Sequence, residues 1–244
     1  MIIDAHNHLG GPDKTDGKSQ SAEEILKVMD EAGIDRAVVF PFNEENPGVS
    51  FSRTNDFIAK TAVCYPDRLT GFCRLDPNAG SAALREFERC IKYLGLRGIK
   101  LHPSSQNFSL DHPVLSDILA MAEEEGTIVL FDTGKEMSPP AGIAKLAGKY
   151  PRLTFIMAHM NLFEESIAAA LFAPNIYVQT TGYFNTKRLG EAVTRLGAGR
   201  IIMGSDSPYL KMGREVEKVR GIPGTTPEEF SLIAGRNAVK VLGL

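Results

Sequence analysis

The 244-residue sequence has few cysteines, no large excess of charge and no long apolar run. Cys64, Cys73 and Cys90 show no Cys-x-x-Cys spacing, which argues against a disulfide framework or a thiolate zinc site and fits a reducing cytoplasm. A net charge of -3 with mixed signs argues against a nucleic-acid groove or a polybasic membrane patch. No apolar run reaches the roughly 18 residues that span a bilayer, and a strand starting at residue 2 leaves no room for a signal peptide. We therefore expect a cytoplasmic protein that binds a small molecule, with homo-oligomer formation left open.

Short apolar or β-branched runs alternate with helical stretches along the whole chain. Their starts are roughly 25 to 35 residues apart, which is the size of a βα unit. Eight strands are predicted, over residues 2–8, 36–41, 69–75, 98–102, 127–132, 153–159, 176–180 and 200–206. No break in composition divides the chain, and a glycine-rich dinucleotide fingerprint is missing. We predict a single (β/α)8 TIM barrel domain over residues 1–244, with an open doubly wound sheet as the alternative.

Two capping boxes predict where helices begin. Ser21 with Glu24 precedes an apolar stripe that Gly33 ends, and Thr226 with Glu229 opens the last helix.

The first predicted strand carries Asp4, His6 and His8 at alternate positions. Because side chains alternate between the faces of a strand, we expect all three on one face. Two imidazoles on one rigid strand suit zinc, manganese or iron. The alternative is a polar strand end whose histidines face solvent or cap a turn.

Further polar residues fall at the carboxyl ends of other predicted strands, where a barrel forms one rim around its axis. They are Lys100, His102, Asp132, His159 and Asp206. Each one alone is typical of a turn or of a half-buried polar group. Burying them together without a cation would leave unpaired charges, each at a cost of roughly several kcal/mol. The sequence therefore predicts one divalent metal ion at this rim.

Several motifs together resemble a known family. They are Asp4-x-His6-x-His8, Gly98-Ile-Lys-Leu-His-Pro103, Ala158-His159, Gly204-Ser-Asp-Ser-Pro208 and the closing stretch 234–244. In this order they resemble the amidohydrolase-2 family of metal-dependent barrels, which includes hydrolases and decarboxylases similar to aminocarboxymuconate-semialdehyde decarboxylase. The resemblance implies that His6, His8 and Asp206 bind the metal, usually zinc, and that His159 lies beside it as a supporting or catalytic group.

The chain departs from the family at the end of the fifth predicted strand, where Asp132 stands in place of the usual histidine ligand. Either Asp132 or His102 is then expected to complete the metal site. A carboxylate makes manganese or iron more plausible beside zinc, because it reduces the net charge of the site. In some relatives a lysine at the position of Lys100 is carbamylated and bridges two metals, but we favour one metal. Lys100 is then expected to pair with a buried carboxylate such as Asp4 or Asp76, or to face the substrate.

We predict a metal-dependent hydrolase that activates a bound water against a C–N or C–O bond of a small molecule. The ion lowers the pKa of the water from about 16 toward 7, Asp206 accepts its proton, and His159 stabilises the developing oxyanion. A decarboxylase or hydratase on the same barrel is the first alternative, and a non-catalytic, metal-poor binding barrel is the second.

Substrate binding is expected from side chains and loops around the rim. Arg74 and Lys100 are candidates for binding an acidic substrate, although Arg74 could instead pair with Asp76. Aromatic residues in the predicted loops either line a pocket for a planar group or pack as plugs; they are Phe42, Phe51, Phe108, Tyr183 and Tyr209.

Overall fold

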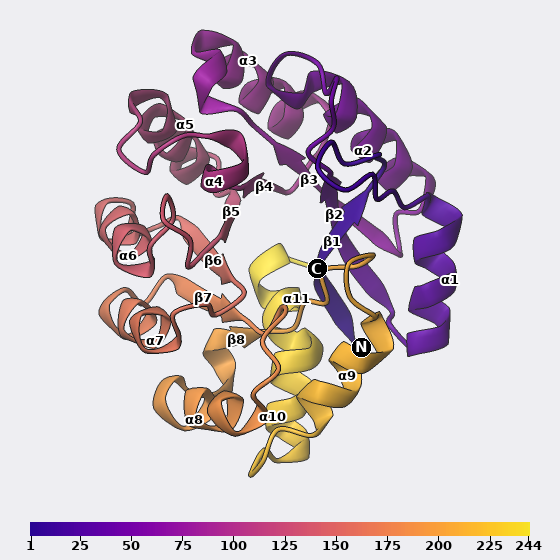
Figure 1. Cartoon of the computed structure of the whole chain (residues 1–244), viewed down its shortest axis with the longest axis vertical. Helices are drawn as coiled ribbons and strands as arrows, with labels where there is room; N and C mark the ends of the chain where they lie inside the picture. The colour runs from indigo at the N-terminus through magenta and orange to yellow at the C-terminus, as the bar shows by residue number, and fades with distance from the viewer.

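The computed structural model describes residues 1–244 and shows a ring of eight parallel strands surrounded by helices (Figure 1). Neighbouring strands follow the chain order from β1 to β8, which confirms the predicted single-domain (β/α)8 barrel. The strands are β1 (Ile3–Leu9), β2 (Arg36–Pro41), β3 (Leu69–Arg74), β4 (Gly98–Leu101), β5 (Ile128–Asp132), β6 (Thr154–Ala158), β7 (Ile176–Gln179) and β8 (Ile201–Ile202).

Most of the helices cover the outside of this ring (Figure 1). The α-helices are α1 (Ala22–Ala32), α2 (Ser52–Cys64), α3 (Ser81–Glu88), α4 (Pro103–Gln106), α5 (Pro113–Glu124), α6 (Pro140–Lys149), α7 (Phe163–Phe172), α8 (Thr186–Leu196), α9 (Met212–Arg220), α10 (Pro227–Ser231) and α11 (Asn237–Leu242). Both predicted capping boxes form, at Ser21 with Glu24 and at Thr226 with Glu229. None of these helices has both the length and the apolar character needed to cross a bilayer.

The C-terminal helix closes one end of the barrel. Ala238 and Leu242 of α11 belong to the same apolar cluster as Ile3, Ile128 and Tyr177, which lie at or near the beginnings of their strands. Figure 1 shows α11 in yellow near the middle of the ring. Because α11 covers the amino ends of the strands, the carboxyl ends form the open mouth of the barrel.

Three of the predicted strands, the fourth, sixth and eighth, end before the polar residue that each was expected to carry at its end. β4 ends at Leu101 and β6 at Ala158, so His102 and His159 lie just beyond their strands. The prediction of a strand over 200–206 is wrong beyond Ile202, because β8 pairs with β7 only at Ile201 and Ile202. The chain after β8 bonds to β1 instead, and Asp206 N donates to His6 O at 2.8 Å.

An irregularity in β1 separates Asp4 from the two histidines. The pairing of β1 with β2 shifts between Asp4 and Asn7, which is typical of a bulge. Ile3 and Ala5 join the apolar cluster inside the barrel, and Asp4 instead accepts hydrogen bonds from the amides of His6 and Ser205. The expectation that Asp4 shares a face with His6 and His8 is therefore wrong, because it assumed unbroken alternation.

We predict that replacing Gly98 with alanine destabilises the barrel. A Cβ atom at this position would lie 2.5 Å from two atoms of the Phe72 ring, which is completely buried inside the barrel. Such overpacking typically costs about 1–3 kcal/mol. The urea midpoint of Gly98→Ala should fall accordingly, whereas Gly199→Ala, with open space at its Cβ, should leave the midpoint nearly unchanged. Equal midpoints for the two variants would contradict this packing argument.

Candidate metal centre

One cavity of about 540 Å³ opens at the carboxyl ends of the strands. All eight residues that the sequence analysis proposed for the site line this cavity: His6, His8, Arg74, Lys100, His102, Asp132, His159 and Asp206. They come from six different strands or the loops that follow them. The barrel therefore brings together side chains that are up to 200 residues apart in the sequence.

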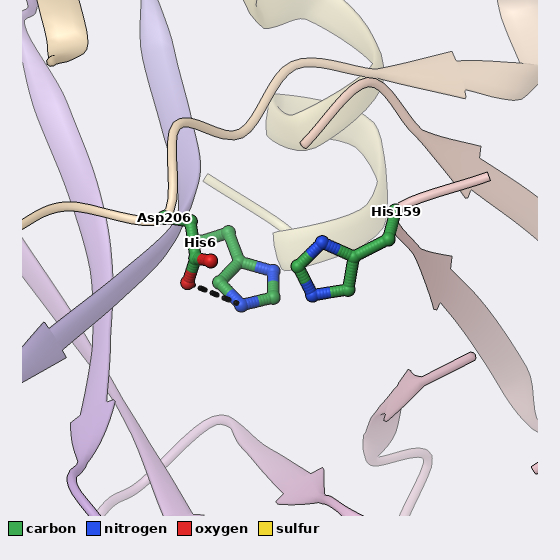
Figure 2. A group of neighbouring side chains, drawn as sticks. All are labelled: His6, His159 and Asp206. Atoms are coloured by element: carbon green, nitrogen blue, oxygen red, sulfur yellow. Dashed lines mark ion pairs between the residues drawn. The ribbon is translucent and has the colours of Figure 1, made fainter. Parts of the chain in front are cut away.

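A first cluster joins the two ends of the chain. The Nε2 atoms of His6 and His8 each lie 3.3 Å from Oδ1 of Asp206. Ligand atoms of His6, Asp206 and His159 lie within 4.8 Å of one another, and Figure 2 shows these three side chains facing a common space. Such a group of imidazole and carboxylate donors could hold one divalent cation.

The backbone at Asp206 and His159 is in the left-handed region, with φ values of 71° and 74°. For residues with a side chain this conformation costs on the order of 1–3 kcal/mol and occurs mostly where the surrounding structure enforces it. At Asp206 the enforcing contact is the hydrogen bond to His6 O at 2.8 Å. The position of this carboxylate is therefore set by β1 as well as by its own loop.

Gln179, at the end of β7, fixes the protonation of His6. Its Oε1 lies 2.7 Å from His6 Nδ1, and its own Nε2 donates to Ala5 O at 3.0 Å, which identifies Oε1 as the acceptor. Thr181 Oγ1 donates to the same Oε1 at 2.9 Å. His6 therefore carries its proton on Nδ1, and the lone pair of Nε2 points toward Asp206.

A second cluster surrounds Asp132 at the end of β5. Nε2 of His159 lies 3.1 Å from Asp132 Oδ2, and Nε2 of His102 lies 3.3 Å from the same atom. Lys135 Nζ lies 3.1 Å from Oδ1. Burial acts to raise the pKa of Asp132, but the hydrogen bond from His159 and the neighbouring cations hold it well below its usual value.

His102 is committed to the backbone in this structure. It forms the N-cap of α4, and its Nδ1 accepts a hydrogen bond from Ser105 N at 3.1 Å. Burial lowers the pKa of His102 to about 3, so the ring is neutral and its proton lies on Nε2, facing Asp132. The lone pair that a metal would need is used at Ser105.

Lys100 lies between the two clusters. Its Nζ is 3.0 Å from His6 Nε2 and 4.8 Å from the centre of the Phe40 ring. Burial lowers its pKa to about 8, although Asp132 and Asp206 oppose this shift. The Lys100 ammonium thus lies beside the lone pair of His6. A metal ion near this place would be attracted by the same carboxylates, Asp132 and Asp206.

These contacts decide how well the residues fit a divalent ion. His6 presents a lone pair, and burial lowers the pKa of both His6 and His8, which keeps the two rings neutral. Burial opposes ionisation of Asp206, but the hydrogen bond from His8 holds its pKa below the usual value. Two neutral imidazoles with an ionised carboxylate are a donor set that suits zinc, manganese or iron.

Arg74 is a buried cation without an anionic partner. Its guanidinium bonds only to neutral acceptors: Ser105 Oγ at 2.9 Å, Pro41 O at 3.3 Å and Gln106 Oε1 at 3.4 Å. It forms no ion pair with Asp76, and its side chain is 1% exposed at the wall of the cavity. Burial lowers its pKa to about 10, so it remains charged at neutral pH. An unpaired buried charge of this kind is stabilised when an anion enters the cavity.

Several residues at the site were not found from the sequence. Gln179 and Lys135 were missed, although each had a signal: Gln179 is the polar end of an apolar strand, and Lys135 follows Asp132 by three residues. Asp13, Asn43 and Ser104 also line the cavity. Asp13 and Asn43 lie in loops and Ser104 lies in the short helix α4, and the sequence pattern does not specify the path of these segments.

Comparison with known proteins identifies the family of the chain. The model of the Amidohydro_2 family, described as amidohydrolase, matches residues 3–244. The chain belongs to this amidohydrolase family. The predicted family resemblance is confirmed, and the motifs at both ends of the chain fall within the match.

The curated relatives that match the chain are decarboxylases. The chain is 25% identical to a gamma-resorcylate decarboxylase of Polaromonas sp. over 250 residues, covering 75% of this chain and 76% of the relative. It is 24% identical to a 2-amino-3-carboxymuconate-6-semialdehyde decarboxylase of Dictyostelium discoideum, covering 78% of this chain and 65% of the relative. A solved dihydroxybenzoic acid decarboxylase from Polaromonas sp., with bound manganese and 2-nitroresorcinol, has a TM-score of 0.78 at 20% identity, covering 100% of this chain and 97% of that chain.

We predict that Gln179→Leu weakens metal binding by this protein. Loss of the acceptor for His6 Nδ1 removes the constraint that directs Nε2 to the ion, and such changes typically cost about 10–100-fold in metal affinity. Competition with a chelator measures the affinity directly. Thr181→Val is the matched control, because it removes a hydrogen bond to Gln179 but leaves the bond to His6. Equal weakening in both variants would show that the buried network, and not the His6 contact, governs affinity.

We predict that His102 makes the metal-free protein less stable as the pH falls. Its pKa is about 3 in the folded protein and 6.5 when unperturbed, so below pH 6.5 the unfolded chain binds a proton that the folded protein does not. The free energy of unfolding should then fall by up to about 1.4 kcal/mol per pH unit. His102→Asn keeps an acceptor for Ser105 N and removes the titration. Urea unfolding from about pH 7 to about pH 5 should show a steeper loss of stability in the wild type; parallel profiles would contradict the assignment.

Proposed function

We propose that this protein is a metal-dependent, non-oxidative decarboxylase of a small carboxylic acid. The observation that carries the proposal is Arg74, a buried guanidinium that forms no ion pair and lines the cavity that also holds the metal-site candidates. The matched curated relatives, which are decarboxylases, favour this chemistry over hydrolysis of a C–N or C–O bond. Hydrolysis was the primary expectation from the sequence and becomes the second candidate.

The charge of the cavity supports an anionic substrate. Apart from the imidazoles, its lining carries four aspartates against Arg74, Lys100 and Lys135, which leaves one net negative charge. A divalent ion reverses the sign to one net positive charge. The loaded cavity would therefore attract a carboxylate, and Arg74 could bind it through two parallel hydrogen bonds.

We propose His6, His8 and Asp206 as ligands of one divalent ion, with His159 next to it. Asp132 and His102, the two candidates for the missing histidine ligand, would hold His159 and α4 in place. Manganese is the first candidate because it is the ion in the solved Polaromonas structure, and zinc and iron remain alternatives. The bound ion would supply positive charge that stabilises negative charge developing on the substrate.

The residues of the chain would divide the remaining work. Arg74 and Lys100 would orient the acid in the cavity. When the C–C bond breaks, carbon dioxide leaves and the electron pair stays on the substrate carbon, which then takes a proton. His159 would deliver that proton, and the ionised Asp132, 3.1 Å from its Nε2, would balance the charge of the doubly protonated ring.

We predict carbon dioxide release when the manganese-loaded enzyme is incubated with small carboxylic acids. Arg74→Met should raise KM at least about tenfold because it removes a charge-assisted bidentate contact. His159→Asn should lower kcat about 100-fold or more because it removes the proton donor. Release of an amine or alcohol from amides, esters or lactones, without carbon dioxide from any acid, would support hydrolysis instead.

Metal analysis tests the remaining alternative of a metal-poor binding barrel. Protein purified without chelator should contain close to one divalent ion per chain, and His6→Ala or His8→Ala should lose it. Wild-type protein without bound metal would contradict the proposed enzyme.

A further inference from the structure

The backbone of Arg74 extends beyond the part of β3 that pairs with β2. β2 and β3 pair at three positions, of which Val39 with Gly71 is the last. On its other side, β3 remains paired with β4 up to Arg74, which lies opposite Lys100. Because Arg74 is 1% exposed, its amide N–H and its carbonyl group need partners inside the protein, and the pairing with β2 does not supply them.

One side chain of α2, Asn55, supplies both partners. Its Oδ1 accepts a hydrogen bond from Arg74 N at 2.9 Å, and its Nδ2 donates to Arg74 O at 3.0 Å. A neighbouring parallel strand would bond to the same two groups of one residue, so the Asn55 amide takes the place of a strand. Asn55 is 0% exposed and does not line the cavity. It therefore acts on the cavity through the backbone of Arg74.

Glu86 of α3 fixes the direction of the Asn55 amide. Its Oε1 accepts a hydrogen bond from Asn55 Nδ2 at 2.8 Å and one from Cys90 Sγ at 3.1 Å. Arg89 donates to both carboxylate oxygens, from Nε to Oε2 at 2.8 Å and from Nη2 to Oε1 at 3.0 Å. Because a carboxylate accepts hydrogen bonds and cannot donate them, the Asn55 amide has to turn its nitrogen toward Glu86 and its oxygen toward Arg74 N.

The residue before α2 also contacts the guanidinium of Arg74. Arg74 Cζ lies 5.1 Å from the centre of the Phe51 ring, within the range of a cation–π contact. Phe51, Phe42 and Phe108 are 0–4% exposed and do not line the cavity, so these three of the expected loop aromatics pack as plugs. The segment from Phe51 to Asn55 thus holds Arg74 at two points, the side chain through Phe51 and the backbone through Asn55.

We infer that Asn55 is a positioning residue for the carboxylate of the substrate and that Glu86 sets its orientation. The inference rests on the proposed function in one respect, that Arg74 binds the acid group. Two parallel hydrogen bonds to a carboxylate need the guanidinium in one place and one plane. Its hydrogen bonds within the protein are to neutral acceptors at 2.9–3.4 Å, and a fixed backbone adds the constraint that these contacts lack.

Selectivity for a carboxylate over its neutral amide measures the contribution of Arg74. Benzoate and benzamide have nearly the same shape, and both can be titrated calorimetrically into the manganese-loaded protein. Wild-type protein should prefer benzoate, and Arg74→Met should lose at least about tenfold of this preference. Asn55→Ala should lose about five- to tenfold, because a small misplacement of a binding group weakens its contacts. The same change in the Arg74→Met background should alter the preference less than about twofold.

The outcomes separate this inference from the proposed function. No preference for benzoate in the wild type, or an unchanged preference in Arg74→Met, would contradict the acid-binding role of Arg74. A preference that Arg74→Met abolishes and Asn55→Ala retains would overturn only the positioning role of Asn55. An equal loss from Asn55→Ala with and without Arg74 would mean general damage to the site and would also overturn that role.

Asn237→Ala is the matched control for the loss of a buried amide. Asn237 is 3% exposed, and its Nδ2 donates to Ala198 O at 2.7 Å and to Ile201 O at 2.8 Å, at the amino end of β8. This variant should keep the wild-type preference for benzoate. A loss equal to that of Asn55→Ala would overturn the inference.

Glu86→Gln provides a second test that leaves Asn55 in place. The variant keeps the size of the side chain but turns an amide nitrogen toward one of the groups that donate to Glu86. It should lower the preference for benzoate about two- to fivefold when Arg74 is present, and less than about twofold in the Arg74→Met background. If Asn55→Ala does not fold, this variant decides, and a full wild-type preference in it would overturn the inference.

Discussion

Backbone hydrogen bonds between the first strand and the loop after the last strand hold the proposed centre together. Ala5 N donates to Met203 O at 3.0 Å, Asp206 N to His6 O at 2.8 Å, and His8 N to Ser207 O at 2.8 Å. They continue the barrel wall where β8 itself has ended. Because they run through the backbone of His6, His8 and Asp206, closing the barrel and assembling the cluster are one event.

The electrostatics of the cavity follow from this enclosure. Burial lowers the pKa of His6, His8 and Lys100, while hydrogen bonds from His159 and His8 help to keep Asp132 and Asp206 ionised. Neutral imidazoles and ionised carboxylates are the states in which such groups bind a divalent ion. Arg74 adds a buried positive charge that forms no ion pair within the protein, so an anionic partner has to come from outside. The cavity is thus suited to hold a cation and an anion together.

The family and the cavity carry different kinds of information. The barrel and the metal motif are common to enzymes with different chemistries, so membership of the amidohydrolase family does not decide the substrate. The segments after β2, β4 and β8 supply Asn43, Ser104 and Tyr209, with Ser104 in helix α4, and these segments contribute to the polarity of the wall.

The sequence alone determined the eight βα units, the capped helices and the presence of His6, His8, His159 and Asp206 near one rim, because strand periodicity and strand-end polarity are local properties. It could not determine that Asp4 leaves the face of His6, since a bulge depends on the pairing with β2. It also could not determine that Gln179 orients His6, that His102 caps α4, or that Arg74 lacks an anion. Those facts depend on contacts between residues far apart in the chain, and only the closed barrel brings such residues within hydrogen-bonding distance.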